Sequence, residues 1–496
     1  MPDPAAPDRS PPALRDLAEA CEGVLRGEGA VDVVDVTHDS RTVGPGVLYA
    51  CRPGRTADGH DFAPEAARQG AVGLLVERWL EVDLPQVRVP SVADAVGPVA
   101  AMVHGHPSAE LALFGITGTN GKTTTAYLLE AVLSAAGHVT GLVGTVETRI
   151  AGEAVAGVRT TPEATDLQRL LRRMFDAGVT AAAMEVSSHG LALGRVHGSA
   201  FRAVGFTNLS QDHLDFHGDM ERYFAAKRRL FDGTYARVGV VAVDDDWGRR
   251  LADTADCEVR TLSLAGPGAD ICARELRQHP GGSEFTAQLP GQAVRVRTPL
   301  VGPFNVSNAL MALGLAHAGG IDVTAGAVGL TSLPGVPGRM EPVDAGQPFA
   351  VLVDYAHTPD AVARVLEAAR SAVDADGRVI VVLGCGGDRD RDKRPHMGRA
   401  AAQGADIAVL TSDNPRSEDP EAILQQVAAG ARDAGGAPDI EPDRRAAIAR
   451  ALDGACPGDV VVIAGKGHEA TQEVAGQFLP FDDRAVAAEL LREEGA

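Results

Sequence analysis

A glycine-rich turn between an apolar strand and a helical segment constrains the fold of this chain more than any other feature. Residues 113–117 have the composition of a buried strand, and the stretch after Lys122 has helical apolar periodicity. The turn that joins them is Thr117-Gly118-Thr119-Asn120-Gly121-Lys122-Thr123. Its backbone N–H groups can surround phosphates, while Lys122 reaches the outer phosphates and the Thr123 hydroxyl binds Mg²⁺.

One position departs from the usual phosphate-loop pattern, because Ile116 stands where that pattern has its first glycine. The alternative interpretation is an ordinary glycine turn with a solvent-exposed lysine. The strand and the helix on either side favour the phosphate-binding loop.

The rest of the chain indicates an α/β protein of several domains. Its 496 residues correspond to about three domains of roughly 150 residues each. Short apolar runs alternate with helical segments, which is typical of largely parallel sheets, and a Pro/Gly-rich segment around residues 335–341 marks a boundary. We predict a small N-terminal α/β domain (residues 1–107), a central phosphate-loop domain with a mostly parallel sheet (108–337) and a C-terminal Rossmann-like domain (338–496).

Charge and composition exclude several classes of protein. The chain has 46 basic and 67 acidic residues, a net charge of −21, which disfavours nucleic acid and anionic membranes as partners. No apolar run reaches the roughly 18 residues of a membrane span, and the first residues are acids and prolines rather than a signal peptide. The six cysteines lack the spacing of a metal site or a disulfide framework. We therefore expect a cytoplasmic protein that binds small molecules.

Three further residues in the central region could carry chemistry. Glu185 follows an apolar strand, where a carboxylate suits Mg²⁺, although such a residue more often caps a helix or pairs with arginine. His213 also follows a strand end, but a single histidine is usually structural. Lys227 lies in an amphipathic helical segment at residues 223–231, and composition alone favours a surface position for it.

The last domain combines arginines with glycines in loops after apolar strands. Arg389 lies in one such loop and Arg416 in another. The planar guanidinium binds a carboxylate with two hydrogen bonds, which suits an amino-acid or phosphate substrate. The alternative interpretation is a solvated loop of salt bridges.

Taken together, these motifs resemble those of the Mur ligases of peptidoglycan synthesis. The resemblance covers nearly the whole chain, including TGTNGKTTT, TTPEA, MEVSSHGL, FTNLSQDHLDFHGDM, AAKRRLF, GPFNVSNAL, VPGRME, VDYAHTPD, GCGGDRDRDKRP, TSDNPR and AGKGHE. It implies an enzyme that transfers the γ-phosphoryl group of ATP to a substrate carboxylate, after which an amine attacks the acyl phosphate. ATP and Mg²⁺ are the implied cofactors, and we expect a monomer without nucleic-acid partners or membrane insertion.

The resemblance also implies roles for individual residues at the nucleotide site. Lys122, Glu185, His213 and Lys227 match the catalytic positions. Thr123 and Glu185 would bind one Mg²⁺, and His213 would help to bind a second. Lys227 would carry a carbamate formed with CO₂, which turns a cation into an anion that can orient or bridge to Mg²⁺. The ATP-binding positions are the turn 117–123 together with Asn305, Asn308, Arg339 and Asp354.

The other two substrates are assigned in the same way. The positions matching those that bind the UDP-linked substrate are Ser40, Arg55, Thr56 and Ala57 at the uridine end, and Thr160, Thr161, Ser187 and Arg195 at the dipeptide end. Leu193 departs from the family pattern, since some relatives have glutamine there. The positions matching those that bind the incoming amino acid are Arg389, Asp413, Asn414, Pro415, Arg416, Gly465 and Glu469.

Arg416 decides which amino acid is expected. Relatives that add L-lysine typically have alanine there, so the arginine implies ligation of meso-2,6-diaminopimelate to UDP-N-acetylmuramoyl-L-alanyl-D-glutamate. Two alternatives remain open. One is a related Mur or folylpolyglutamate-type ligase with another acceptor such as L-lysine, and the other is a catalytically inactive nucleotide-binding regulator.

Overall fold

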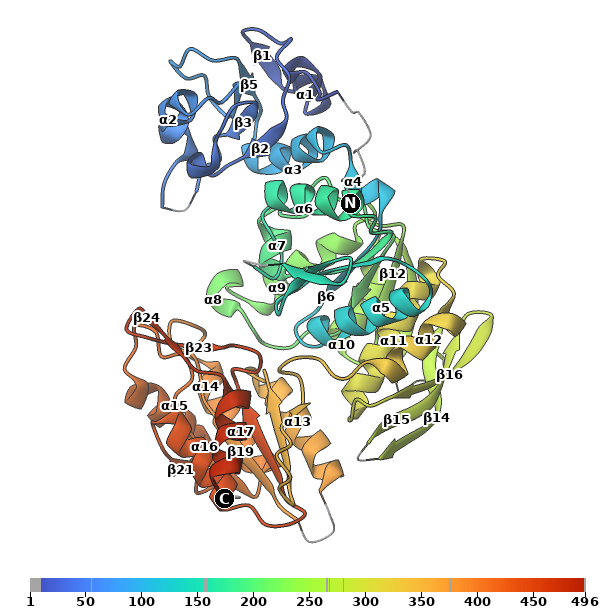
Figure 1. The fold of residues 1–496 in the computed structure, drawn as a ribbon, viewed down its shortest axis with the longest axis vertical. Coiled ribbons are helices and arrows are strands. Elements are labelled where there is room, and N and C mark those ends of the chain that lie inside the picture. Colours follow the sequence, from blue (N-terminus) through green and yellow to red (C-terminus); the bar gives the residue numbers. More distant parts are fainter. Residues whose placement is uncertain are drawn as a thin grey trace.

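The protein consists of three α/β units in a row, and the middle unit contacts both others (Figure 1). The computed structural model describes residues 10–54, 56–155, 159–264, 266, 268–279, 281–373 and 377–494. Each unit is built on its own sheet, and most strand pairs at the centre of these sheets are parallel, as the alternating pattern predicts. The acidic, proline-containing start of the chain (residues 1–9) and Arg55 lie outside the described residues.

The N-terminal unit has a five-stranded sheet in the order β1-β5-β4-β3-β2, in which only the β1–β5 pair is antiparallel. Its helices are short except α3, which lies toward the middle unit (Figure 1). The elements are α1 (Leu14–Ala20), β1 (Val24–Arg26), β2 (Asp35–Thr37), η1 (Ser40–Thr42), β3 (Val47–Ala50), η2 (Gly59–Phe62), α2 (Ala63–Arg68), β4 (Gly73–Val76), β5 (Gln86–Arg88), α3 (Val92–Val103) and α4 (Pro107–Glu110).

The middle unit has an eleven-stranded sheet in the order β16-β15-β14-β13-β12-β11-β6-β10-β7-β8-β9. In this order, the strands from β14 across to β7 are all parallel to their neighbours and form the centre of the sheet. Antiparallel strands extend it at both edges. Its strands are β6 (Ala112–Thr117), β7 (Thr140–Val143), β8 (Thr148–Ile150), β9 (Glu153–Val155), β10 (Ala181–Glu185), β11 (Ala203–Phe206), β12 (Val238–Ala242), β13 (Glu258–Ser263), β14 (Ile271–His279), β15 (Gly282–Leu289) and β16 (Gln292–Thr298).

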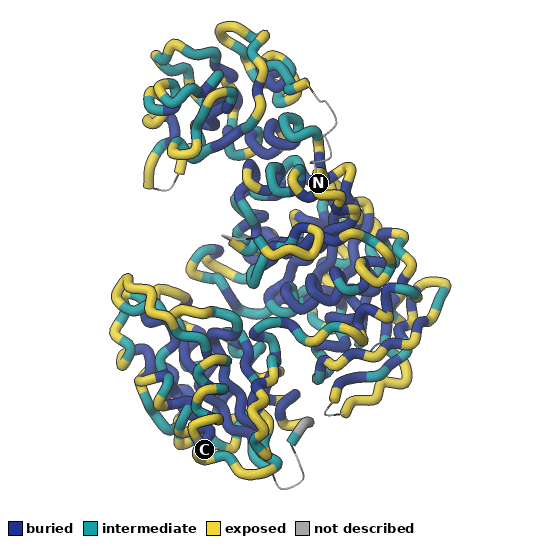
Figure 2. Tube along the Cα trace, viewed as in Figure 1, coloured by how far each residue is buried: buried dark blue, intermediate teal, exposed yellow. Residues whose placement is uncertain are grey.

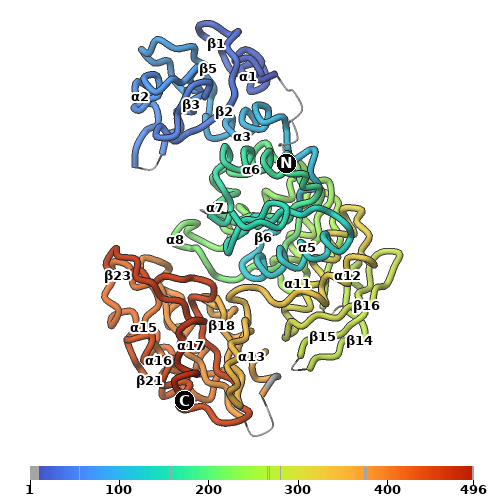
Figure 3. Tube along the Cα trace, viewed as in Figure 1, coloured from blue at the N-terminus to red at the C-terminus, as the bar shows by residue number. Residues whose placement is uncertain are grey.

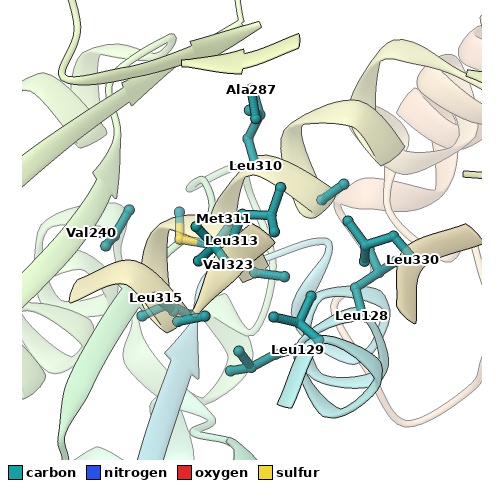
Figure 4. Packing of buried hydrophobic residues seen from close by; sticks show 14 of the residues in the cluster. Leu128, Leu129, Val240, Ala287, Leu310, Met311, Leu313, Leu315, Val323 and Leu330 are labelled. Carbon is teal, nitrogen blue, oxygen red and sulfur yellow. The ribbon is translucent and has the colours of Figure 1, made fainter. Parts of the chain in front are cut away.

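The helices of the middle unit enclose its core. They are α5 (Lys122–Ala135), α6 (Ala164–Asp176), α7 (Ser188–Ala192), α8 (Leu214–His217), α9 (Met220–Arg228), η3 (Arg229–Phe231), α10 (Asp246–Thr254), α11 (Pro303–Ala318) and α12 (Val323–Ser332). In one cluster, Leu128 and Leu129 of α5 pack with Leu310 of α11 and Leu330 of α12 (Figure 4). Because a parallel sheet is covered on both faces, its central strands are buried along their length, as residues 113–117 of β6 are.

The C-terminal unit has a six-stranded sheet in the order β17-β18-β22-β19-β20-β21 and a separate hairpin. Buried residues fill the centre of this unit, and the exposed residues lie around them (Figure 2). The elements are β17 (Glu341–Pro342), β18 (Ala350–Asp354), α13 (Pro359–Ala372), β19 (Val379–Leu383), α14 (Lys393–Gly404), β20 (Ile407–Leu410), α15 (Pro420–Asp433), β21 (Asp439–Ile440), α16 (Arg444–Asp453), β22 (Val460–Ala464), β23 (Thr471–Val474), β24 (Gln477–Pro480) and α17 (Asp483–Glu494).

The path of the chain places the two boundaries between units far apart (Figure 3). The carboxyl ends of β6, β10 and β11 lie on one edge of the middle sheet, since these strands are parallel neighbours. Open parallel sheets bind ligands at this edge. Within the described ranges, no helix has both the length and the apolar character needed to cross a bilayer.

Candidate active site

The glycine-rich turn connects β6 to α5, as the sequence predicts, and the neighbouring loop holds it in place. The Thr119 N–H donates to the Asn208 carbonyl (2.9 Å) and the Asn120 N–H to Asn208 Oδ1 (2.9 Å). Gly118 has φ +148, and a Cβ there would lie 1.9 Å from Thr207 Oγ1. Glycine is therefore required at this position by the close approach of the loop after β11.

Lys122 begins α5 and folds back over the turn. Its Nζ donates to the carbonyls of Gly118 (3.0 Å) and Thr119 (2.8 Å). Burial lowers the pKa of this lysine. Lys122 lines a cavity of about 490 Å³ between the middle and C-terminal units, so the turn faces a space of ligand size.

Glu185 and Thr123 come together at this cavity. The carboxylate is buried at the end of β10 and accepts a hydrogen bond from the Thr123 hydroxyl (3.1 Å). It also accepts from the Thr145 N–H (2.8 Å) and hydroxyl (3.1 Å). A carboxylate and a hydroxyl beside a phosphate-binding turn fit Mg²⁺, which prefers oxygen ligands and completes its shell with phosphate and water. Sequence reasoning missed Thr145, which follows β7 without any recognisable local motif.

Lys227 is buried, so the surface position favoured by composition is wrong. Only 1% of the residue is exposed, and its Nζ donates to the Gly118 carbonyl (2.7 Å) from helix α9. The amine also lies 4.7 Å from the centre of the Tyr223 ring. Burial, followed by the charge of Lys122, holds the pKa of Lys227 well below its ordinary value.

His213 lies just before α8 with a left-handed backbone (φ 54). Its ring packs edge-on against His189, with 4.8 Å between ring centres. Burial lowers the pKa of His213 to about 3, which leaves the imidazole neutral and able to bind a metal. Among the described residues, no three His, Cys, Asp or Glu side chains converge as a metal site.

The C-terminal unit supplies the opposite wall of the cavity. Arg339 Nη2 donates to the Thr123 hydroxyl (3.1 Å), and the guanidinium lies 4.5 Å from the centre of the Tyr355 ring. Asp354 accepts from the N–H groups of Met340 and Ala356 (both 2.7 Å), and its burial raises its pKa. Arg339 therefore reaches the turn from another unit, and Asp354 lines the same cavity.

Asn305 and Asn308 also line the cavity, from the first turns of α11. Asn308 Nδ2 donates to Asn305 Oδ1 (3.3 Å), and Asn305 Nδ2 donates to the Val301 carbonyl (2.8 Å). Asn308 Oδ1 in turn accepts from Thr125 of α5 (3.3 Å). The two amides therefore have fixed orientations at the cavity.

A cluster that no single motif reveals joins the two units next to His213. Asp212 of the middle unit lies 3.7 Å from His357 Nε2 and 3.7 Å from Lys393 Nζ of the C-terminal unit. Burial would raise the pKa of Asp212, but the neighbouring His357, His213 and Lys393 hold that pKa well below its usual range. The cluster was not predicted because its members are far apart in sequence.

The residues assigned to the UDP-linked substrate form two groups. Thr161 and Ser187 share a hydrogen bond (3.1 Å), and Arg195 pairs with Glu163 (2.8 Å) at the boundary with the N-terminal unit. Thr160 bonds the Thr145 hydroxyl (3.0 Å), which connects this group to Glu185. Ser40, Thr56 and Ala57 lie on the N-terminal unit, in η1 and in the turn before η2.

One ion pair across this boundary was not predicted. Arg52 of the N-terminal unit pairs with Glu163 (3.1 Å) and donates to the Leu193 carbonyl (3.0 Å). Leu193, which departs from the family pattern, thus uses its backbone in a contact between units. A glutamine side chain is not required for that contact.

The residues assigned to the acceptor lie at the carboxyl edge of the C-terminal sheet. Asp413, Asn414, Pro415 and Arg416 follow β20, whereas Gly465 and Glu469 follow β22. Asn414 Nδ2 donates to Glu469 Oε2 (2.7 Å), so these two predicted residues meet. A Cβ on Gly465 would lie 2.4 Å from Asp413 Oδ2, which explains the glycine.

The two arginines of this region differ in their surroundings. Arg416 has a left-handed backbone (φ 53), donates to the Gly387 carbonyl (2.7 Å) and pairs with Glu473 of the hairpin (3.2 Å). Arg389 is exposed and donates to the Asp388 carbonyl (3.0 Å). Arg416 is therefore the more firmly held of the two.

Fold and site together define a phosphate-loop α/β protein with a cavity of ligand size between two of its units. Models of three protein families match the chain: Mur ligase family, catalytic domain (residues 32–106), Mur ligase middle domain (116–316) and Mur ligase, glutamate ligase domain (338–467). The chain belongs to the Mur ligase family, whose members are ATP-dependent ligases.

Individual relatives are similar over the full length. The chain is 49% identical to the UDP-N-acetylmuramoyl-L-alanyl-D-glutamate--2,6-diaminopimelate ligase of Streptomyces coelicolor, with 99% of both chains covered. It is 45% identical to the Geobacillus thermodenitrificans protein of that name, covering 95% and 97%. A solved structure under the same name matches with a TM-score of 0.69 at 32% identity over 98% and 99%. MurF from Acinetobacter baumannii (TM-score 0.67, 19% identity, 97% and 99% covered) shares the fold.

Proposed function

We propose that this enzyme ligates meso-2,6-diaminopimelate to UDP-N-acetylmuramoyl-L-alanyl-D-glutamate at the expense of ATP, in the synthesis of peptidoglycan precursors. The observation that carries the proposal is the cavity between two domains, which Lys122, Glu185 and Arg339 line together. The residues expected to bind the acceptor amino acid lie on the same C-terminal domain as Arg339. The curated relatives of this name, similar over their full length, support this choice of substrates.

The reaction requires two anions to meet. The terminal carboxylate of the UDP-linked dipeptide attacks the γ-phosphorus of ATP, ADP leaves, and the amine of the acceptor then displaces phosphate from the acyl phosphate. Lys122 neutralises the transferring phosphoryl group, and the turn orients the phosphates through its N–H groups. Thr123 and Glu185 would hold Mg²⁺, which when bound offsets phosphate charge.

Lys227 is proposed to work as a carbamate. Its amine is buried, and its lowered pKa favours the neutral form that can react with CO₂. The resulting anion would lie beside Lys122, close to the Gly118 carbonyl, and His213 would assist in binding a second Mg²⁺. An anion at this place would reverse the repulsion that two neighbouring ammonium groups otherwise exert.

The remaining substrate assignments follow the division into domains, for which we propose boundaries near residues 107 and 337. Ser40, Arg55, Thr56 and Ala57 would contact the uridine end, whereas Thr160, Thr161, Ser187 and Arg195 would contact the dipeptide. Arg389, Arg416 and Glu469, with the segment 413–415 and Gly465, would bind diaminopimelate. We further propose a cytoplasmic monomer.

The direct test is release of ADP with the UDP-linked dipeptide and each of three acceptors: meso-diaminopimelate, L-lysine and L-ornithine. We expect turnover with diaminopimelate that depends on all three substrates and on added Mg²⁺. Preference for L-lysine would refute the proposed acceptor. Nucleotide binding without product from any acceptor would instead identify an inactive regulator.

A further inference from the structure

Lys466, in the loop after β22, is a buried cation to which the reaction above assigns no role. None of its surface is exposed. Its Nζ lies within hydrogen-bonding distance of the Thr471 carbonyl (2.5 Å), Asn414 Oδ1 (3.3 Å) and Glu469 Oε2 (3.4 Å). An ammonium group has three donors on one atom, and here three acceptors surround that atom.

The loop that carries Lys466 packs tightly against its neighbours. Gly465 and Gly467 flank this lysine, both with positive φ (+114 and +52). A Cβ on Gly467 would lie 2.7 Å from Tyr355 Cβ, and one on Gly465 would meet Asp413. The two glycines therefore let the loop pass close to neighbours on both sides, with Lys466 between them.

Lysine is rare in this chain. The chain has 42 arginines and only four lysines. Lys122 and Lys227 contact the phosphate-binding turn, and Lys393 lies 3.7 Å from Asp212 at the domain boundary. Lys466 is the fourth. Lysine differs from arginine in offering a compact ammonium, which suits three acceptors placed around a single nitrogen.

Lys466 fixes the orientation of two side chains at the acceptor site. Asn414 Oδ1 accepts from Lys466 and from the Glu473 N–H (2.9 Å), so its Nδ2 must point the other way, toward Glu469. Glu469 Oε2 is then engaged by Asn414 and Lys466. Its other oxygen, Oε1, accepts a hydrogen bond from the Tyr355 hydroxyl (3.4 Å).

We propose that Lys466 is a positioning residue for the acceptor amino acid. Its ammonium holds the Asn414 amide, the Glu469 carboxylate and the start of the hairpin β23–β24 in one framework. Glu469 is thereby presented to the distal amine of the acceptor. This inference rests on the proposed function, because the acceptor must carry such an amine.

The test uses Lys466→Met, which removes the ammonium but keeps an unbranched side chain. Hydrogen bonds to charged groups are worth enough for a loss of about 10- to 100-fold in kcat/KM for diaminopimelate. We expect this loss through a raised KM for diaminopimelate, with the KM values for ATP and the UDP-linked dipeptide unchanged. The matched control is Arg445→Met, which removes a half-buried cation of the same domain, paired with Glu489 at 3.0 Å.

A second acceptor separates positioning from general structural damage. 2-Aminopimelate keeps the distal carboxylate but lacks the distal amine that Glu469 would bind. Wild-type enzyme should prefer diaminopimelate, and Lys466→Met should lose most of that preference. Lys466→Arg is measured if the methionine variant does not fold. It keeps the charge without three donors on one atom, and we expect the same loss of preference.

Three outcomes would overturn the inference. One is an unchanged preference between the two acceptors in a folded variant, and another is a wild-type KM for diaminopimelate. The third is an equal effect on all three substrates. A wild-type enzyme that does not use diaminopimelate would instead refute the proposed function, so the two failures are distinguishable.

Discussion

At the scale of single residues, Lys227 shows that local sequence can predict a helix without predicting the burial of a residue in it. The pattern at residues 223–231 predicts an amphipathic helix, and α9 with the following 3₁₀ turn occupies this segment. Composition places the lysine on the surface, yet its partner is the Gly118 carbonyl, 109 residues earlier in the chain. The burial results from packing of α9 against the phosphate-binding turn, which local periodicity does not report.

The carbamate at Lys227 can be tested by chemical rescue. Lys227→Ala is expected to be inactive, because the site then lacks the anion, and acetate should restore part of the activity by filling the space. Lys227→Arg should be equally inactive. Activity with and without acetate, and incorporation of ¹³C-labelled CO₂ into wild-type enzyme, are the measurements. An active arginine variant would show that the residue acts as a cation.

Arg416 combines recognition with an uncommon backbone conformation. Its φ of 53 is more favourable for glycine than for other residues, so Arg416→Gly should fold at least as well as Arg416→Ala. Both variants lose the guanidinium. We expect a fall in kcat/KM for diaminopimelate of as much as about 10⁴-fold, as for sites built to pair a polar group. Thermal unfolding monitors the backbone effect separately.

The controls for Arg416 are the kinetic constants for ATP and for the UDP-linked dipeptide, which should change far less. Lysine activity need not appear, because Glu469 and Arg389 still shape the pocket. If Arg416→Gly has the same kcat/KM for diaminopimelate as wild type, this arginine does not recognise the acceptor amino acid.

At the scale of elements, the strand–turn–helix unit from β6 to α5 is the part that sequence predicts best. Apolar strand, glycine turn and periodic helix are all local signals, and they are consistent with one another. The hairpin β23–β24 is different. It was not predicted, and it matters because its backbone pairs with Arg416 and its Glu473 forms the ion pair. The hairpin holds Arg416 through contacts between loops that are separate in sequence, and local sequence patterns do not predict such contacts.

The histidines around α7 and α8 predict a pH dependence of stability. Burial lowers the pKa of His213 to about 3 and of His217 to about 4, and it also lowers the pKa of His189. In the unfolded chain these groups bind protons near pH 6.5. Between these values the unfolded state binds more protons, so the stabilisation is complete above about pH 6.5 and is lost as pH falls toward 4.

We therefore expect the urea midpoint to fall between pH 7 and pH 5, measured with EDTA present. His217→Gln, which keeps a polar group near the Ser188 hydroxyl (3.0 Å in the native enzyme), should flatten this dependence. Arginine and carboxylate pairs elsewhere remain unchanged in the variant. A slope identical to that of wild type would contradict a contribution from His217.

At the scale of the whole molecule, the proposed sites are divided among three domains. The residues proposed to contact uridine lie on the first domain, and the phosphate-binding turn lies on the second. The residues proposed to bind the acceptor amino acid lie on the third. The second and third domains are already joined at the cavity by Arg339 with Thr123 and by Asn120 Nδ2 with Asp360 (3.0 Å). Sequence motifs indicate which domain carries each residue. The relative placement of the domains depends on contacts between side chains such as Asp212 and Lys393, and no sequence pattern predicts that these two residues meet.

This division predicts domain closure on binding. The cavity lies between domains, so a nucleotide bound there contacts both and adds contacts only if they approach. The UDP-linked substrate would likewise span the boundary where Arg52 pairs with Glu163 (3.1 Å). We expect small-angle scattering to report a smaller radius of gyration with both ligands than without, and an intermediate value with nucleotide alone.

Because each ligand bridges a different boundary, Arg52→Ala should reduce the change in radius of gyration caused by the UDP-linked substrate. The change caused by nucleotide should stay the same in this variant. Identical profiles in all states would mean that the three sites are aligned before any substrate binds.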